Sequence, residues 1–124
     1  MARVLIIDDD LPTCDFLKMY LTKKGYEAKW ALSGEDGIEV AETYNPHIVF
    51  LDVDLGKGHA SGLEILQRLK SRNDTVAVIM MTANDDPASI DYAKEQGAFE
   101  YVIKPFSLDY LERDVLPKIL NQLI

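Results

Sequence analysis

Short apolar runs, each closed by a polar residue, constrain the fold of this chain more than any other feature. The runs and their closing residues are 4–7 with Asp8 and Asp9, 48–51 with Asp52, 76–81 with Thr82, and 101–103 with Lys104. Continuous apolar runs of this length are typical of parallel strands that are buried on both faces. Open α/β sheets place their binding sites at the carboxyl ends of such strands. We therefore expect these polar side chains to meet at one edge of a sheet.

Helical patterns alternate with the expected strands along the whole chain. We expect strands near residues 3–8, 27–31, 48–52, 76–82 and 99–103, and helices near 11–24, 34–44, 62–72, 87–96 and 107–122. Pro12 near the start of the first helix and Gly25 just past its end are typical boundary signals. Five strand–helix pairs predict an α/β fold with a doubly wound, five-stranded parallel sheet and helices on both faces.

Three side chains carry more specific structural expectations. Pro117 falls inside the last expected helix, where it removes one hydrogen bond and should kink or interrupt that helix. Trp30 lies on the second strand, which we expect at a sheet edge, so its ring should be only partly buried. His47 follows Asn45-Pro46 at the start of a strand and is interpreted as structural.

Length and charge restrict the function classes that remain. The 124 residues predict a single domain over 1–124 with its own core. The net charge of -8 gives no general attraction to nucleic acid or to anionic membranes. No apolar stretch approaches the ~20 residues that span a bilayer, and we recognise no signal peptide, so we expect a cytoplasmic protein. The single cysteine, Cys14, excludes an internal disulfide and is interpreted as a core residue.

Several sequence motifs resemble those of one family. They are Val4-Leu5-Ile6-Ile7-Asp8-Asp9-Asp10, then Ile48-Val49-Phe50-Leu51-Asp52 followed by Gly62-Leu63-Glu64, then Met81-Thr82-Ala83, and finally the stretch from Gly97 to Phe106 that contains Lys104-Pro105. In this order and spacing they cover essentially the whole chain, which is similar to the receiver domains of response regulators, the phospho-accepting half of two-component signalling. The chemotaxis-regulator-like resemblance implies a flavodoxin-like (βα)5 fold with strand order 2-1-3-4-5.

The residue types make chemical sense without the family name. An aspartate carboxylate such as that of Asp52 can attack phosphorus and form an acyl phosphate. The attack brings anionic oxygens together, so it needs a divalent cation and fixed positive charge. Asp8 and Asp9 can supply the oxygen ligands that Mg²⁺ prefers. Thr82 offers a hydroxyl donor, and Lys104 offers a mobile point charge to the phosphoryl oxygens.

The family resemblance makes these roles more specific. It implies that Asp52 accepts a phosphoryl group from a sensor histidine kinase or a histidine phosphotransfer protein. Mg²⁺ would be bound directly by Asp9 and Asp52, largely through water by Asp8, and by the backbone carbonyl of Asp54. It also implies a cis peptide bond between Lys104 and Pro105, the kind of bond in which cis costs little. Such a domain catalyses only its own phosphoryl transfer and dephosphorylation.

The resemblance also implies a two-state switch. The Thr82 hydroxyl would move toward the phosphoryl group, and the aromatic ring of Tyr101 would turn into the vacated space. The output face would comprise the fourth helix, the last strand and the last helix, and it could support a homodimer or contact a downstream protein or a fused output domain. Candidate surface residues on this face are Tyr92, Tyr101, Tyr110 and Arg113.

The chain departs from the family pattern beside the expected site. The loop from Val53 to Gly62 has about two extra residues and three glycines, so we expect it to be mobile over the site. Asp54 adds a fourth acidic side chain, which could raise the affinity for Mg²⁺ or repel an anionic phosphodonor. Asn84 lies near the expected path of attacking water. Lys57 and His59 are interpreted as solvated loop residues.

Other interpretations of the same residues remain open. Asp10, which precedes Leu11-Pro12, is interpreted as a helix cap, and an Asp pair after a strand can also be a turn. An interaction module that keeps the fold without the chemistry is one alternative function. A second is a phosphatase, because Asp52-Val53-Asp54 resembles the start of the haloacid-dehalogenase motif, although that family places it on the first strand of a longer chain.

Overall fold

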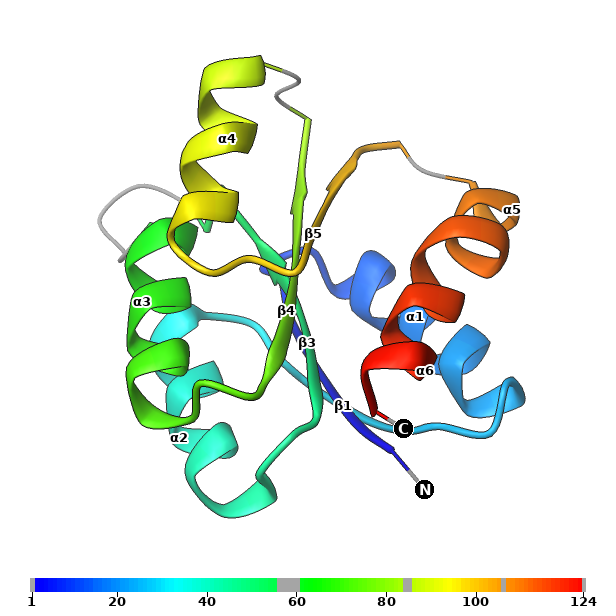
Figure 1. The fold of residues 1–124 in the computed structure, drawn as a ribbon. Coiled ribbons are helices and arrows are strands. Elements are labelled where there is room, and N and C mark those ends of the chain that lie inside the picture. Colours follow the sequence, from blue (N-terminus) through cyan, green and yellow to red (C-terminus); the bar gives the residue numbers. More distant parts are fainter. Residues whose placement is uncertain (1, 56–60, 84–85, 106, 124) are drawn as a thin grey trace.

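The computed structural model describes residues 2–55, 61–83, 86–105 and 107–123. Its strands are β1 (Arg3–Ile7), β2 (Glu27–Ala31), β3 (Ile48–Asp52), β4 (Ala77–Thr82) and β5 (Glu100–Ile103). They form one parallel sheet in the order β2-β1-β3-β4-β5 (Figure 1). The doubly wound α/β fold and the strand order expected from the sequence are both confirmed, and each strand boundary agrees within one residue.

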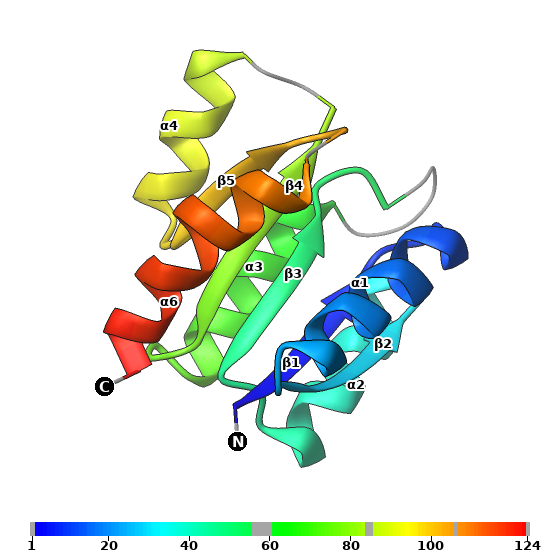
Figure 2. The ribbon, with the colours of Figure 1, turned by 90° about the vertical axis from the view of Figure 1, so that its right-hand side faces the viewer.

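The helices lie in two layers on either side of the sheet. They are α1 (Leu11–Lys23), α2 (Gly34–Tyr44), α3 (Gly62–Arg72), α4 (Pro87–Glu95), α5 (Leu108–Tyr110), the π-helical turn η1 (Leu111–Val115) and α6 (Leu116–Leu123). Figure 1 shows α2, α3 and α4 on one side, and Figure 2 shows α1 and α6 in front of the other. No helix in the described residues is long and apolar enough to cross a membrane.

The first helix follows its sequence signals closely. The Asp10 side chain caps it by accepting a hydrogen bond from the Thr13 N–H, as the cap interpretation predicted. Gly25 follows the helix with a φ of 94°, a conformation that favours glycine. The inward stripe consists of Cys14, Leu17 and Leu21, all buried. This stripe holds α1 against the sheet and fixes the turn that carries Asp8 and Asp9.

The last helical segment is not the single helix that we expected over 107–122. A π-helical turn, η1, separates α5 from α6, and within it the Leu116 N–H donates to the Leu111 carbonyl. Pro117 is the second residue of α6 and has no N–H to donate to a carbonyl in the preceding turn. The interruption expected from Pro117 is therefore present, and the wider turn still buries Leu111 and Val115 against the sheet.

Two hydrophobic clusters, one on each face, position the central strands. β3 and β4 are buried throughout, and β1 is buried beyond Arg3. Because neighbouring parallel strands end together, their carboxyl ends form one edge of the sheet, away from the N and C labels in Figure 2. At the sheet edge, Trp30 on β2 is partly buried, as expected. His47 accepts a hydrogen bond from the Arg3 N–H at 3.0 Å, in keeping with its structural interpretation.

Candidate functional site

Two neighbouring central strands bring three aspartates together at the carboxyl edge of the sheet. β1 and β3 pair with Ile7 opposite Leu51, so the residues that follow, Asp8 and Asp52, lie side by side. Asp8 is fully buried and Asp52 is 6% exposed, whereas Asp9 is exposed to solvent. One carboxylate oxygen from each of Asp8, Asp9 and Asp52 lies within 4.8 Å of the others. The carboxylates expected from the sequence thus form one cluster.

Lys104 follows β5 and reaches across the strand ends to this cluster. Its Nζ lies 2.8 Å from Asp8 Oδ2 and 3.7 Å from Asp52 Oδ2. Its backbone N–H donates to the Thr82 carbonyl at 2.6 Å, which ties the loop after β5 to the end of β4. The Lys104–Pro105 peptide bond is cis, as expected. The ammonium group is therefore held inside the acidic cluster.

The carboxyl group of Asp52 has a raised pKa because it is buried beside a second carboxylate. Burial and the neighbouring charge of Asp8 raise its pKa from the ordinary 3.8 to about 6, although Lys104 and the N–H of Asp54 both act to lower it. For Lys104, burial alone would lower the pKa, but the hydrogen bond to Asp8 and the charges of both aspartates outweigh burial and raise it. Lys104 therefore stays charged, and its charge does not fully compensate the two buried carboxylates.

Two backbone N–H groups support the buried carboxylates, and the sequence analysis did not identify them. The Asp10 N–H donates to Asp8 Oδ1 at 2.9 Å, and the Asp54 N–H donates to Asp52 Oδ1 at 3.2 Å. Both donors sit two residues beyond their acceptor, which is the spacing of an Asx turn. That spacing is the signal that could have revealed them.

Thr82 and Tyr101 form a pair next to the cluster. Thr82 is 5% exposed and lines a hollow of about 550 Å³ together with Asp9, Asp52 and Lys104. Burial raises the pKa of the Tyr101 hydroxyl, while a side-chain hydrogen bond with Thr82 acts to lower it. The expectation that Tyr101 is a surface residue is wrong: its ring is 6% exposed and packs in the cluster that contains Ala93 of α4. The other candidates, Tyr92, Tyr110 and Arg113, are exposed.

A glycine that the sequence analysis quoted only as part of a motif has a definite structural role. The N–H of Gly62 donates to the Val53 carbonyl at 2.9 Å as α3 begins. A Cβ at this position would lie 2.5 Å from the Val53 Cα and 2.6 Å from the Asp52 carbonyl oxygen. Only glycine allows the start of α3 to approach the strand end this closely, so Gly62 helps to fix the backbone of Asp52.

Several expected neighbours of the site do not add to the described cluster. The Asp54 side chain is exposed, and the carboxylate cluster does not include it. Asn84 and the loop residues 56–60, with Lys57 and His59, lie outside the described residues. Cys14 lies behind the site, where its Sγ donates to the Asp8 carbonyl at 3.3 Å. Burial, then the charge of Asp8, raises the Cys14 pKa to about 12, so the thiol is neutral and structural.

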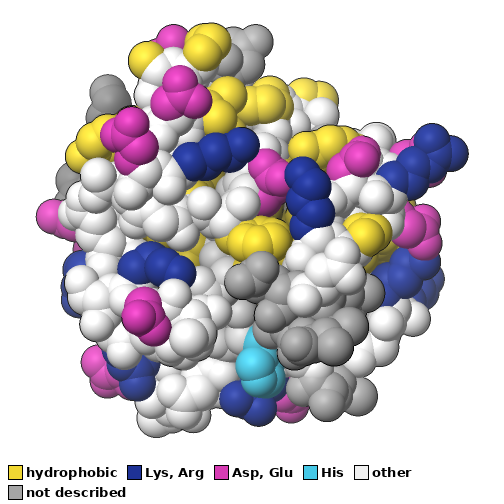
Figure 3. Space-filling model, in the orientation of Figure 1, with side chains coloured by type: hydrophobic (Ala, Val, Ile, Leu, Met, Phe, Trp, Pro, Cys, Tyr) yellow, Lys and Arg dark blue, Asp and Glu magenta, His cyan; other side chains and the backbone are white. Residues whose placement is uncertain are grey.

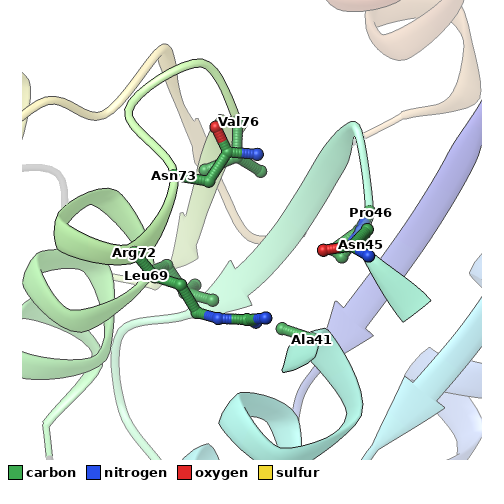
Figure 4. A pocket seen from close by; sticks show the side chains of 7 residues that line it. All are labelled: Ala41, Asn45, Pro46, Leu69, Arg72, Asn73 and Val76. Carbon is green, nitrogen blue, oxygen red and sulfur yellow. The ribbon is translucent and has the colours of Figure 1, made fainter. Parts of the chain in front are cut away.

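A second hollow lies elsewhere and has a different character. This crevice of about 230 Å³ lies between the C-terminal ends of α2 and α3, and Figure 4 shows Arg72 extending along it toward Ala41. It contains no carboxylate, thiol or hydroxyl side chain among its lining residues, which are Ala41, Asn45, Pro46, Leu69, Arg72, Asn73 and Val76. It therefore offers no side chain that could accept a phosphoryl group, and the carboxyl edge remains the candidate site.

The carboxyl edge fits a hard divalent cation and an anion side by side. Mg²⁺ prefers a few carboxylate oxygens and retained waters, and Asp9 and Asp52 offer oxygens to an open hollow. Lys104 and Thr82 line the same hollow and can donate to anionic oxygens. The surface around α3, α4 and β5 in Figure 3 intersperses basic with acidic side chains and shows no continuous basic patch on that face.

Sequence comparisons agree with this geometry. Residues 4–116 match the response regulator receiver domain family. The transcriptional activator protein IrlR of Burkholderia pseudomallei is 38% identical over 110 residues, which cover 89% of this chain and 46% of that protein. The transcriptional regulatory protein AfsQ1 of Streptomyces coelicolor is 34% identical over 105 residues, covering 85% of this chain and 45% of that protein. The chain thus spans less than half the length of these relatives.

Solved structures show the same fold over nearly the whole chain. A two-component response regulator from Clostridium difficile superposes with a TM-score of 0.90 at 28% identity, covering 99% of this chain and 98% of that one. A CheY-like response regulator receiver domain protein from Methanospirillum hungatei also gives 0.90, at 25% identity, covering 99% and 97%. The fold and its five-stranded sheet are therefore shared with both structures.

Proposed function

Because this chain belongs to the response regulator receiver domain family of two-component systems, we propose that it is a phosphorylation-activated switch with Asp52 as the phosphoryl acceptor. One observation carries the proposal. The carboxylates of Asp8, Asp9 and Asp52 converge within 4.8 Å, and the ammonium group of Lys104 lies among them. Burying two carboxylates side by side is costly for a fold, so a site that accepts this cost is a good candidate for chemistry.

Asp52 is suited to be the nucleophile. With a pKa of about 6, its carboxylate is mostly ionised at neutral pH yet more basic than an ordinary aspartate. One carboxylate oxygen would form a bond to phosphorus while the bond from phosphorus to the donor atom breaks, leaving an aspartyl phosphate. Neighbouring negative charge opposes the approach of an anionic donor, so the step needs compensating positive charge.

Mg²⁺ bound at the aspartates would supply that positive charge when present. Asp9, exposed beside the hollow, and Asp52 would hold it directly, and the backbone carbonyl of Asp54 would complete the protein ligands. Both oxygens of Asp8 already have partners, since Oδ2 accepts from Lys104 and Oδ1 accepts from the Asp10 N–H. This favours a role for Asp8 through water rather than in direct contact with the ion.

Lys104 and Thr82 would bind the phosphoryl oxygens. The Lys104 Nζ is only 3.7 Å from Asp52 Oδ2, so a small side-chain movement away from Asp8 would place it on a phosphoryl group attached to Asp52. The Thr82 hydroxyl lies at the end of the adjacent strand and lines the same hollow. Each group would donate one charge-assisted hydrogen bond to the product.

The Thr82–Tyr101 pair would carry the signal away from the site. A phosphoryl group competes with Tyr101 for the Thr82 hydroxyl, so phosphorylation would change the hydrogen bonding of a buried ring that packs against α4. The face formed by α4, β5 and the last helical segment, which comprises α5, η1 and α6, would then be the output face, with Tyr92, Tyr110 and Arg113 exposed on it. A partner would favour the switched state by its differential affinity.

The partners follow from this role. A sensor histidine kinase or a histidine phosphotransfer protein would donate the phosphoryl group. The output would be a downstream protein or a fused output domain, since IrlR and AfsQ1 are transcriptional regulators of more than twice the matched length. The output face could also form a homodimer. The chain would act as an enzyme only on its own aspartyl phosphate.

The test is the intact mass of the chain after incubation with acetyl phosphate and Mg²⁺. We expect one added phosphoryl group on the native chain and on Asp109→Ala, a control at an exposed acidic residue of α5, but none on Asp52→Ala. Addition to Asp52→Ala as well would reject Asp52 as the acceptor. With no addition to any chain, beryllofluoride binding decides, and its absence would favour an interaction module. Turnover of a simple phosphate ester would favour a phosphatase.

A further inference from the structure

A groove lies between the end of β2 and α2, and it shares no lining residue with the hollow at the aspartate cluster. Its volume is about 660 Å³, and we call it the β2–α2 groove. The residues that define it come from the end of β2, the following turn and the outer face of α2, namely Trp30, Leu32, Asp36, Glu39, Val40 and Glu42. None of them belongs to the proposed phosphoryl-transfer site.

The backbone of β2 offers one free row of hydrogen-bonding groups. The Glu27 N–H donates to the Ala2 carbonyl, and the Ala31 carbonyl accepts from the Asp8 N–H, so both of these residues face the neighbouring segment of β1. Because backbone groups alternate along a strand, those of Ala28 and Trp30 point the other way. β2 is one of the two edge strands of the described sheet, so this row faces no other strand. Such an edge is a template for an added strand.

The α2 side of the groove is acidic. Asp36, Glu39 and Glu42 are all exposed on α2, whose opposite face, with Ile38, is buried. Within the described ranges, none of these three carboxylates forms an ion pair. Their charges are therefore available to a partner, and a cation placed between them would interact with more than one of them.

The other side of the groove is apolar. Leu32 is 43% exposed, and Trp30 is partly buried with its ring against the α1 face of the sheet. The Lys18 Nζ lies 5.1 Å from the Trp30 ring centroid, so that ring already carries a cation on one side. An incoming side chain here gains most by being apolar. The two sides of the groove thus favour side chains of different kinds.

We propose that the β2–α2 groove is a docking site for an extended, cationic segment of a partner protein, which adds to β2 as a further strand. Side chains of an extended segment alternate between the two faces of a sheet. Lysine or arginine at alternate positions would point toward Asp36 and Glu39, and the intervening apolar side chains would contact Trp30 and Leu32. Backbone pairing with Ala28 and Trp30 supplies affinity, and the alternation supplies specificity.

The acidic charge of the groove favours a cationic segment over the other partners that an open strand edge could bind. A second copy of the chain carries a net charge of -8 and would bring a second acidic α2 against the first. Anionic lipid and nucleic acid are repelled by the same carboxylates. A cationic polypeptide is the class of partner that matches both the acidic side of the groove and the free backbone row.

The probe is a blocked nonapeptide of alternating lysine and valine, added to the isotope-labelled chain in saturating Mg²⁺ and low salt. We expect amide chemical-shift changes confined to β2, the turn at Leu32 and α2. Two probes test the mechanism: one with N-methyl groups along its pairing edge, and one with glutamate in place of lysine. Both should fail to produce these changes, because the first cannot pair as a strand and the second carries the wrong charge.

Matched protein variants complete the test. Glu39→Lys should weaken binding by about tenfold, since it removes one attraction and adds a repulsion. Glu95→Lys makes the same charge change on exposed α4 and should leave binding within about twofold. The proposal would be overturned if both variants weakened binding equally or if the N-methylated probe bound as well as the parent peptide. It would also be overturned if the chemical-shift changes were confined to Asp8, Asp9 and Asp52, or if the peptide did not bind.

Discussion

Two of the buried carboxylates lie in opposite electrostatic settings, Asp52 at the site and Glu100 on β5. Glu100 is 8% exposed, close to the 6% of Asp52. Burial alone would raise the Glu100 pKa, but hydrogen bonds from Lys118 and the Tyr101 N–H, and the charges of Lys118 and Lys94, lower it overall. Similar burial therefore gives opposite shifts, because Glu100 faces two lysines whereas Asp52 shares one lysine with Asp8.

The difference separates a carboxylate that stabilises the fold, Glu100, from the one to which the proposed function assigns the reaction, Asp52. Lys118 Nζ lies 2.9 Å from Glu100 Oε2, and Lys94 Nζ lies 3.7 Å from Oε1, so the pairs link α4, β5 and α6. Asp52 has its Lys104 contact at 3.7 Å and a like charge beside it. The first arrangement holds elements of the proposed output face together. The second lowers stability until positive charge arrives.

The largest effect that tests this contrast is expected from Asp52→Asn in the presence of EDTA. The folded pKa of about 6 lies above the ordinary 3.8, so the folded native chain binds the proton more tightly and loses stability as pH rises from about 4 through 6. The uncharged amide of the variant avoids that loss, and we expect it to gain up to about 3 kcal/mol over the native chain at pH 7. Urea unfolding of both chains from pH 4 to 8 measures this gain in stability. A gain that persists unchanged at pH 4 would contradict the electrostatic explanation.

Mg²⁺ should stabilise the folded chain by a smaller amount, and only through binding at the aspartate cluster. At ten times the dissociation constant, a ligand that binds only the folded chain adds about 1.4 kcal/mol, or about 5 °C in melting temperature for a domain of this size. We expect Asp9→Asn to lose most of this shift, because Asp9 would contact the ion directly. Calorimetry with and without Mg²⁺ measures it, and Glu100→Gln serves as the control that keeps the full shift. Equal shifts in native chain and Asp9→Asn would remove Asp9 from the ligand set.

Glu100→Gln should have the smallest effect and the opposite sign to Asp52→Asn. The folded pKa of Glu100 lies below its ordinary 4.5, so its contribution is present above that pH and is lost as pH falls through the folded pKa. Both lysine side chains are more than half exposed, so we expect a loss of only about 1 kcal/mol at pH 7. The midpoints of urea unfolding of the native chain and the variant at pH 7 and pH 3 measure this loss of stability. If the loss is as large at pH 3, packing rather than charge explains it.

Much of this arrangement could be predicted from the sequence, because it depends on where strands end. The apolar runs before Asp8, Asp52 and Thr82 predicted a shared sheet edge, and the structure has that edge with Lys104 reaching into it. Side-chain orientation at the last strand was harder. Tyr101 was predicted to be exposed and is buried, because the packing of α4 over β5 is a tertiary feature that a strand pattern does not reveal.

Other features needed spatial neighbours that no local pattern identifies. No sequence pattern singled out Glu100, because its partner Lys118 is 18 positions away. The close approach at Gly62 depends on the path of Val53. The β2–α2 groove was foreseen only as far as Trp30 at an edge strand. The interruption of the last helix was predictable from Pro117, but its form as a π-helical turn was not.

The pairing of β1 with β3 has a consequence for how such a domain can vary. Adjacent strands are about 4.8 Å apart, and Asp8 and Asp52 each follow directly on a paired, fully buried residue, Ile7 and Leu51. The gap between the proposed acceptor, Asp52, and the neighbouring carboxylate of Asp8 is thus set by the distance between adjacent strands of the sheet. Substitutions outside these paired strands can then change the surroundings of the cluster while the spacing of its two buried carboxylates stays constant.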